Sequence, residues 1–321
     1  MIHKLLVKIA TFLGMFFTKL LHLNIFFRFY NFIYEHSSYA IIRIFVKFIS
    51  LPDKDNNWTI FLPNGKKVLT KIQKGNLKTR QFALSHKWHS PSINFTEQML
   101  NQFYGKNIPW IDLGANLGLR SLLTLSENKQ VFFIEPNREL NEINKERCEL
   151  NNFRNYTFLE IGASNKTGEL EFVIDNSSYC STIETNVVDE RNIERIEKIK
   201  INTLDNLFKD KFSSFNTAYI KIDVEGHELK VIEGAKEFIS VLSPTMIIEV
   251  NTKTSHFLEF QKILEPYNYQ IYEIYNFGSK KYFKLINESQ KANNQVLKSN
   301  DFLCVKDKQL IDTINKFAVD N

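Results

Sequence analysis

From residue 108 onward, short apolar runs alternate with longer segments whose apolar positions recur at helical spacing. Five runs are typical of strands that end in turn residues: PWIDLG, QVFFIEP, TFLEIGA, TAYIKIDV and PTMIIEVN. Four segments have helical spacing: NLGLRSLLTLSE, NRELNEINKERCELNN, HELKVIEGAKEFI and HFLEFQKILEPY. ELEFVI and KIKINT predict two further strands, and LDNLF predicts a short helix. This alternation predicts an α/β fold in which helices cover a parallel sheet.

The region before this domain has a different pattern. LPDKDNNWTIFLPNGKKVLTKI contains a turn at Pro63-Asn64-Gly65 between two strand-like runs, TIFL and KVLTKI, which predicts a hairpin. FTEQMLNQF, residues 95–103, has helical spacing. We therefore expect a basic, aromatic N-terminal segment over 1–50, a connecting region with a hairpin and a helix over 51–106, and the main domain over 107–321.

The charge of the chain is concentrated at its N-terminus. The 321 residues carry a net charge of +5, and residues 1–50 hold this whole excess, with six Lys or Arg, one acid and twelve aromatic residues. Because the rest of the chain is neutral, nucleic-acid binding is not expected. The segment fits a helical cap on the main domain or a helix lying on an anionic membrane. A true span ranks third, because the longest early uncharged run, residues 9–18, is shorter than the roughly 20 residues needed.

The cysteine content points to a reducing compartment. Cys148, Cys180 and Cys304 lie far apart, are odd in number and form no CxxC pair. We therefore expect a cytoplasmic protein, and contact with the inner membrane face through residues 1–50 stays open.

A glycine-rich turn follows the first strand of the main domain. The turn runs from Asp112 to Gly118, and Glu135 ends the next strand. Glycines let the backbone approach a ligand, and an acid at the second strand accepts hydrogen bonds from ribose hydroxyls, so the pair predicts an adenosine-containing cofactor. The spacing is neither the GxGxxG of dinucleotide sites nor a P-loop. An anion at position 112 would repel a pyrophosphate but suits the cationic amino-acid end of S-adenosylmethionine.

Five motifs in order resemble the FkbM family of S-adenosylmethionine-dependent methyltransferases. They are WIDLGANLG (110–118), FIEP (133–136), NTLD (202–205), IKIDVEGHE (220–228) and IIEVN (247–251). The resemblance covers about half the chain. It implies a Rossmann-like class I methyltransferase fold, with a mostly parallel seven-stranded sheet and helices on both faces. It also implies O-methyl transfer to hydroxyls of sugars or glycans, polyketides or other secondary metabolites.

The resemblance also assigns cofactor contacts. Asp112, Gly114, Asn116 and Gly118 match the turn around the methionine part of the cofactor, and Glu135 matches the ribose-binding acid. Ala163 and Ser164 match positions near the adenine, although a tight turn before Gly168 explains these two residues equally simply.

The candidate catalytic groups lie along the strand YIKIDVE and just after it. Its alternation places Lys221, Asp223 and Glu225 on one face, where polar residues at a strand end are better explained by a site than by packing. His227 is a candidate base, a candidate substrate contact or a capping neighbour of the helix that follows. Glu228 falls in the first turn of a helix, where an acid complements the helix dipole. Glu249 and Asn251 end the next strand and are expected near Asp223.

The same residues leave some alternatives open. We place a metal-free acid/base site ahead of an Mg²⁺ site and both ahead of zinc, because Cys/His spacing is absent. An NAD-dependent enzyme, or a non-catalytic membrane-associated protein that binds the cofactor, are the competing functions. The acceptor, a small molecule or a glycan, and the oligomeric state are not readable from the residues.

Overall fold

The computed structural model describes residues 55–85, 91–175, 181–184, 193–250, 256–278, 280–286 and 297–319. The chain divides into two compact units, one of Met1–His89 with Glu146–Asn152 and one of Ser90–Lys145 with Phe153–Asn321. The expected boundary at residue 107 therefore differs from the division at residue 90. Residues 1–50, with their three alternatives, lie outside the described part. No helix within the described ranges is long and apolar enough to cross a membrane.

The first unit contains the hairpin that its turn sequence predicts. Strands β1 (Asn56–Phe61) and β2 (Lys67–Ile72) pair in antiparallel register around a turn in which Gly65 has a φ of 80°. Side chains along β2 alternate between exposed and buried, because one face of the hairpin packs into a core. Helix α4 (Leu77–Ser85) follows.

The second unit is built on a mixed sheet of eight strands in the order β12-β11-β13-β10-β9-β3-β4-β5. The strands from β10 to β5 run parallel, whereas the pairs β10–β13, β13–β11 and β11–β12 are antiparallel. The resemblance implied seven strands, and the eighth is β12, which forms a hairpin with β11 at the edge. The strands are β3 (Trp110–Leu113), β4 (Val131–Ile134), β5 (Tyr156–Leu159), β9 (Tyr219–Ile222), β10 (Thr245–Glu249), β11 (Gln270–Gly278), β12 (Lys281–Leu285) and β13 (Asp301–Val305).

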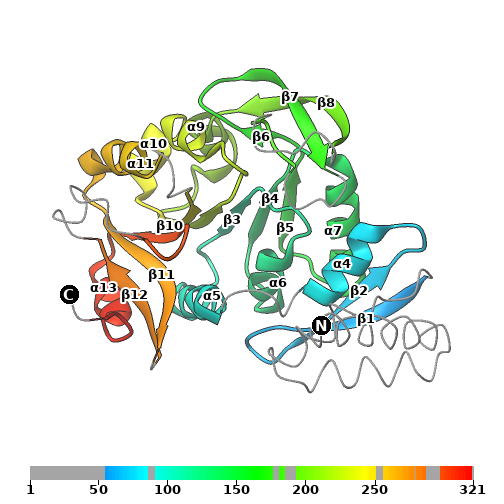
Figure 1. The fold of residues 1–321 in the computed structure, drawn as a ribbon, viewed down its shortest axis with the longest axis horizontal. Helices are drawn as coiled ribbons and strands as arrows, with labels where there is room; N and C mark the ends of the chain where they lie inside the picture. Colours follow the sequence, from blue (N-terminus) through cyan, green and yellow to red (C-terminus); the bar gives the residue numbers. More distant parts are fainter. Residues whose placement is uncertain are drawn as a thin grey trace, which may run out of the picture. The chain divides into compact units, whose positions relative to one another are not determined.

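Helices cover both faces of this sheet, as expected. One face presents Ile111, Ile220 and Met246 to a core shared with α9 (Glu228–Glu233), α10 (Lys236–Leu242) and α11 (His256–Leu264), which lie together in Figure 1. The opposite face presents Tyr219, whose hydroxyl donates to Asn101 Oδ1 at 3.1 Å. Asn101 lies on α5 (Pro91–Phe103), which α6 (Leu119–Ser126) accompanies on this face. The remaining helices are α7 (Arg138–Leu150), α8 (Leu204–Leu207), η3 (Phe208–Phe212), η4 (Glu265–Tyr267) and α13 (Lys308–Asn315).

A small second sheet lies in the same unit (Figure 1). The run TFLEIGA, expected to be one strand, is divided between β5 and the short strand β6 (Gly162–Ala163). β6 pairs in parallel with β8 (Ile193–Asn202), which pairs antiparallel with β7 (Gly168–Asp175). The chain can switch sheets here because Ile161 N donates back to Leu159 O at 2.9 Å, which turns the backbone after β5.

Candidate active site

Asp112 lies at the end of β3 on the sheet face covered by α5 and α6. It is 1% exposed, and its Oδ2 accepts a hydrogen bond from Ser121 Oγ on α6 at 2.6 Å. Its Oδ1 is buried and has no hydrogen-bond partner among the described residues. Burial raises the pKa of Asp112, and Lys221, its register partner on β9, opposes that rise. Asp112 thus offers a buried oxygen that is free to accept one more donor.

The turn after β3 brings two strand ends into backbone contact. Gly114, Asn116 and Gly118 have φ values of 71°, 49° and 68°, which are left-handed. A Cβ on Gly114 would overlap the carbonyl oxygen of Asp223. A Cβ on Gly118 would lie 2.6 Å from Asn144 Oδ1. The glycines were expected to let the backbone approach a ligand closely. In the structure they let it approach the polypeptide itself, so the ends of β3 and β9 pack together.

Glu135 follows β4 and braces this turn. Its Oε2 accepts from the Asn116 N–H and its Oε1 from the Asn137 N–H, both at 2.9 Å. Burial raises the pKa of Glu135 to about 7, and these two backbone donors oppose the rise. Each carboxylate oxygen retains a further lone pair, so the bracing role leaves capacity for a ribose hydroxyl.

The turn after β9 carries the predicted catalytic groups. The strand ends at Ile222, so the alternation expected to extend to Glu225 stops earlier. Asp223 Oδ2 forms an ion pair with Lys221. Glu225 has a left-handed φ of 52°, and its carboxyl makes no hydrogen bond with any other described residue. Burial and then the charge of Asp223 raise the pKa of Glu225 to about 8. The two acids therefore differ: Asp223 is paired, and Glu225 is not.

Glu228 closes the same turn from the first position of α9. Its Oε1 accepts from the Val224 N–H at 3.1 Å and from the Gly226 N–H at 3.0 Å. These bonds fix the backbone between Asp223 and the helix, so the contacts of Glu228 are structural.

Glu249 ends β10 beside this turn. In the sheet it lies opposite Asp301, the first residue of β13. The negative charge of Asp223 and then burial raise the pKa of the Glu249 carboxyl to about 8. Glu249 thus lies close enough to Asp223 to feel its charge, and Asn251 lies outside the described residues.

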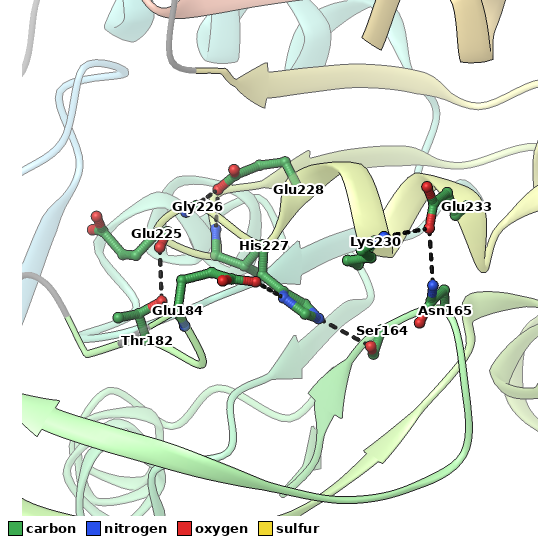
Figure 2. Close-up of polar contacts among 11 residues, drawn as sticks. Ser164, Asn165, Thr182, Glu184, Glu225, Gly226, His227, Glu228, Lys230 and Glu233 are labelled. Atoms are coloured by element: carbon green, nitrogen blue, oxygen red, sulfur yellow. Dashed lines mark hydrogen bonds and ion pairs between the residues drawn. The ribbon is translucent and has the colours of Figure 1, made fainter. Parts of the chain in front are cut away.

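His227 occupies the centre of a polar chain that is buried at Ser164 and His227 and partly exposed at Glu184 (Figure 2). Its Nε2 lies 2.9 Å from Ser164 Oγ, and its Nδ1 lies 2.8 Å from Glu184 Oε1. Ser164 follows β6 and is 1% exposed, and Ala163 is packed into the hydrophobic core. The structure therefore brings Ser164 and His227 together, whereas the Glu225 carboxyl points away from this chain (Figure 2).

The side chains in the described part of the chain do not form a cluster of metal ligands. Within the described ranges, no group of three or more His, Cys, Asp or Glu side chains is arranged to hold a metal ion.

Comparison with known proteins identifies the domain. Residues 112–271 match the model of the methyltransferase FkbM domain. The chain therefore contains an FkbM methyltransferase domain. The matched region is thus a methyltransferase domain, and no curated protein matches the chain significantly.

Solved structures similar to this chain include three methyltransferases. The methyltransferase FkbM from Methylobacillus flagellatus KT is 17% identical with a TM-score of 0.40, and the alignment covers 71% of this chain and 54% of that one. A putative SAM-dependent methyltransferase from Streptococcus mutans is 10% identical with a TM-score of 0.40, covering 83% and 62%. The SAM-dependent methyltransferase from Agrobacterium tumefaciens is 9% identical with a TM-score of 0.41, covering 78% and 70%. At these TM-scores the structural similarity is too weak to support a conclusion, so the assignment of the domain rests on the match over residues 112–271.

Some residues of the FkbM site carry too little local signal to be found as functional candidates. Lys221 is placed on the correct face by strand alternation, but its ion pair with Asp223 depends on the turn after β9. Ser121, Thr182 and Glu184 have no local signal, because their side-chain hydrogen bonds to Asp112, Glu225 and His227 form only in the folded chain.

Proposed function

We propose that the protein transfers a methyl group from S-adenosylmethionine to a hydroxyl oxygen of a sugar, a glycan or a secondary metabolite. S-adenosylmethionine, when bound, supplies a methyl group activated on a positively charged sulfonium. One observation carries the proposal: acids from three neighbouring strands, Asp112, Glu135 and Asp223, gather at the carboxyl ends of β3, β4 and β9. Ligands bind at this edge of such sheets, and a cationic donor matches its charge.

The residues present fit this donor. The buried Oδ1 of Asp112 has no partner in the described part of the chain, so Asp112 would hold the ammonium of the amino-acid end. Gly114 and Gly118 allow the left-handed turn that places Asp112 and Glu135 at the same edge of the sheet. Glu135 would accept the ribose hydroxyls with its remaining lone pairs.

Glu225 best fits the group that accepts the proton of the acceptor hydroxyl. A catalytic base works best when its pKa lies near the working pH, and the pKa of Glu225 is raised to about 8. Its carboxyl has no hydrogen bond to break, whereas Asp223 is engaged by Lys221. Asp223 would instead fix the position of Lys221 and keep the site negative.

The edge of the sheet beyond Asp301 supports a ring-containing acceptor. By register, β11 continues past β13 at the carboxyl edge and carries Tyr275 and Phe277 there. Their ring centroids lie 5.4 Å apart, and Lys298 Nζ lies 5.7 Å and 5.2 Å from them. Tyr275 is 39% exposed, and aromatic rings of this kind are common linings of small-molecule sites. The basic, aromatic segment 1–50 would place this reaction in the cytoplasm near the inner membrane face.

Calorimetry with S-adenosylmethionine on the full chain tests the donor. We expect one molecule to bind per chain, and Asp112→Ala to weaken the affinity at least about a hundredfold, because a buried charge partner is lost. Asp210→Ala, an exposed acid on η3, is the control. Absence of binding by the folded wild type, or preferential binding of NADH, would refute the proposal. Mass spectrometry of glycans from cells with and without the protein then identifies the acceptor by a missing methyl group.

A further inference from the structure

The turn after β9 adopts a backbone that its own sequence does not favour. Glu225 and Gly226 have φ values of 52° and 102°. A left-handed conformation is ordinary for glycine but costs about 1–2 kcal/mol for a residue with a Cβ such as Glu225. Contacts from elsewhere must therefore hold Glu225, the residue proposed above to accept the proton.

A short segment, Ser181–Glu184, supplies two of these contacts. Thr182 Oγ1 donates to the carbonyl oxygen of Glu225 at 2.7 Å, and Glu184 Oε1 lies 2.8 Å from His227 Nδ1. Figure 2 shows both contacts reaching the turn from the same side. The segment thus holds the turn at the residues on either side of Gly226.

The segment is itself anchored to the small sheet. Thr182 and Val173 exchange two backbone hydrogen bonds of 2.8 and 3.0 Å. The Glu184 N–H donates to Thr182 Oγ1 at 2.9 Å, so one hydroxyl orders the Glu184 backbone and the Glu225 carbonyl together. β7 therefore provides a fixed support for a clamp on the turn.

Ser164 completes the chain on the far side of the His227 ring. A carboxylate only accepts hydrogen bonds, so the Glu184 contact makes Nδ1 the protonated nitrogen. Nε2 then accepts a hydrogen bond from the Ser164 hydroxyl, whose Oγ lies 2.9 Å away. The order Ser–His–acid is that of hydrolases, but Ser164 is 1% exposed and cannot reach a substrate. The hydrogen-bonded chain of Ser164, His227 and Glu184 therefore fixes the position of the His227 ring.

We propose that Glu184 and Thr182 are positioning residues for methyl transfer, which act by clamping the turn that carries Asp223 and Glu225. The inference rests on the proposed function only in the role given to that turn. Glu184 fixes the tautomer and the ring of His227, and Thr182 fixes the Glu225 carbonyl. Both residues belong to a segment outside the five motifs that resemble the FkbM family.

Nitrogen-15 NMR of the full chain tests the role of Glu184. In wild type, His227 is expected to show a protonated Nδ1 and an unprotonated Nε2. Glu184→Ala is expected to lose this preference and to raise amide exchange at Val224 and Gly226 about tenfold, as for the loss of one hydrogen bond. Glu184→Gln keeps an acceptor oxygen and is expected to retain the wild-type pattern. Glu233→Gln is the matched control, because Glu233 bonds Asn165 and Lys230 without touching the turn (Figure 2).

Calorimetry on the same variants separates the two proposals. If wild type binds S-adenosylmethionine and Glu184→Ala leaves both His227 and the amide exchange unchanged, the clamp is refuted. If wild type fails to bind S-adenosylmethionine but the tautomer and exchange change as expected, the clamp stands and the proposed function fails. With an acceptor in hand, Glu184→Ala should lower kcat about tenfold with little change in KM for S-adenosylmethionine, and a change in KM alone would count against the clamp.

Discussion

The turns after β3 and β9 lie side by side on neighbouring parallel strands, yet different means hold their left-handed backbones. In the Asp112–Gly118 turn, two of the three left-handed residues are glycines, and Glu135 braces the third through its N–H. In the Asp223–His227 turn, Glu225 is left-handed, and side chains from distant segments hold it. The first turn uses glycine at most of its left-handed positions, which removes most of the backbone strain. The second depends on tertiary contacts, so we expect substitutions to loosen it without unfolding the domain.

The largest expected effect comes from Gly114→Ala, which acts where the two turns touch. The new Cβ would overlap the Asp223 carbonyl oxygen, and the φ of 71° would be strained as well. Because the obstacle is backbone, we expect a loss of about 4 kcal/mol in the free energy of unfolding. Urea denaturation measures this loss. Gly105→Ala is the control, since its Cβ would meet nothing within 4 Å. A Gly114→Ala variant as stable as wild type would show that the turns can separate.

Lys221→Met is expected to have the next largest effect, because it removes the cation between the turns. The carboxylates of Asp112 and Asp223 would then lose their neighbouring cation. We expect this to lower the free energy of unfolding by about 3 kcal/mol. Lys230→Met is the control, because its pair with Glu233 is exposed and contributes about 0.5 kcal/mol or less. Urea denaturation compares the two variants. Equal losses would mean that Lys221 contributes no more than a surface lysine.

The contrast also explains how much the sequence could predict. Glycine positions, a second-strand acid and strand alternation are local, so the sequence places the turn after β3, Glu135 at the end of β4 and the parallel strands where the structure has them, while the roles of these site residues stay predictions. Motif matching supplied the family. The eighth strand lay beyond the matched motifs, and the division between β5 and β6 needed a backbone bond from Ile161 to Leu159 that no periodicity reveals.

The second turn shows the limit of prediction more sharply. The alternation through YIKIDVE predicts a strand that reaches Glu225, but the strand ends at Ile222, and the hydrogen bonds from Val224 and Gly226 to Glu228 shape the turn beyond it. From the sequence alone, a carboxylate such as Glu228, which accepts hydrogen bonds from preceding backbone N–H groups, cannot be distinguished from one that faces a substrate. Thr182 and Glu184 lie about forty residues away, and only the folded chain brings them to the turn.

The ionisation of Glu225 should make stability fall as the pH rises. The pKa of Glu225 is raised from 4.5 to about 8, so between these values the native state binds a proton that the unfolded chain has released. Binding more protons in the native state makes the free energy of unfolding decrease with rising pH across this window. Glu225→Gln cannot ionise, and we expect its decrease between roughly pH 5 and 8 to be smaller by about 1–2 kcal/mol.

Urea denaturation at both pH values measures this difference. Glu169→Gln, which changes an exposed carboxyl on β7, should leave the wild-type decrease unaltered. Glu97 and Glu135, whose pKa values burial raises to about 7, contribute in the same direction and remain in every variant. If the free energy of unfolding decreased equally in wild type and Glu225→Gln, Glu225 would be ionised in the native protein across this whole pH range. The argument for Glu225 as the catalytic base would then be lost.

The smallest expected effect, from Thr182→Val, separates the two turns most directly. Valine has nearly the shape of threonine and keeps the backbone pairing with Val173, but it removes the hydroxyl that donates to the Glu225 carbonyl. We expect a loss of about 1 kcal/mol in the free energy of unfolding, and Thr313→Val on α13 is the control, because its hydroxyl bonds Gln309 O within its own helix. The affinity for S-adenosylmethionine, measured by calorimetry, should stay within about twofold, because Gly114, Gly118 and Glu135 hold the first turn independently. A parallel loss of cofactor affinity would show instead that the two turns respond as one unit, with the distant hydroxyl shaping both.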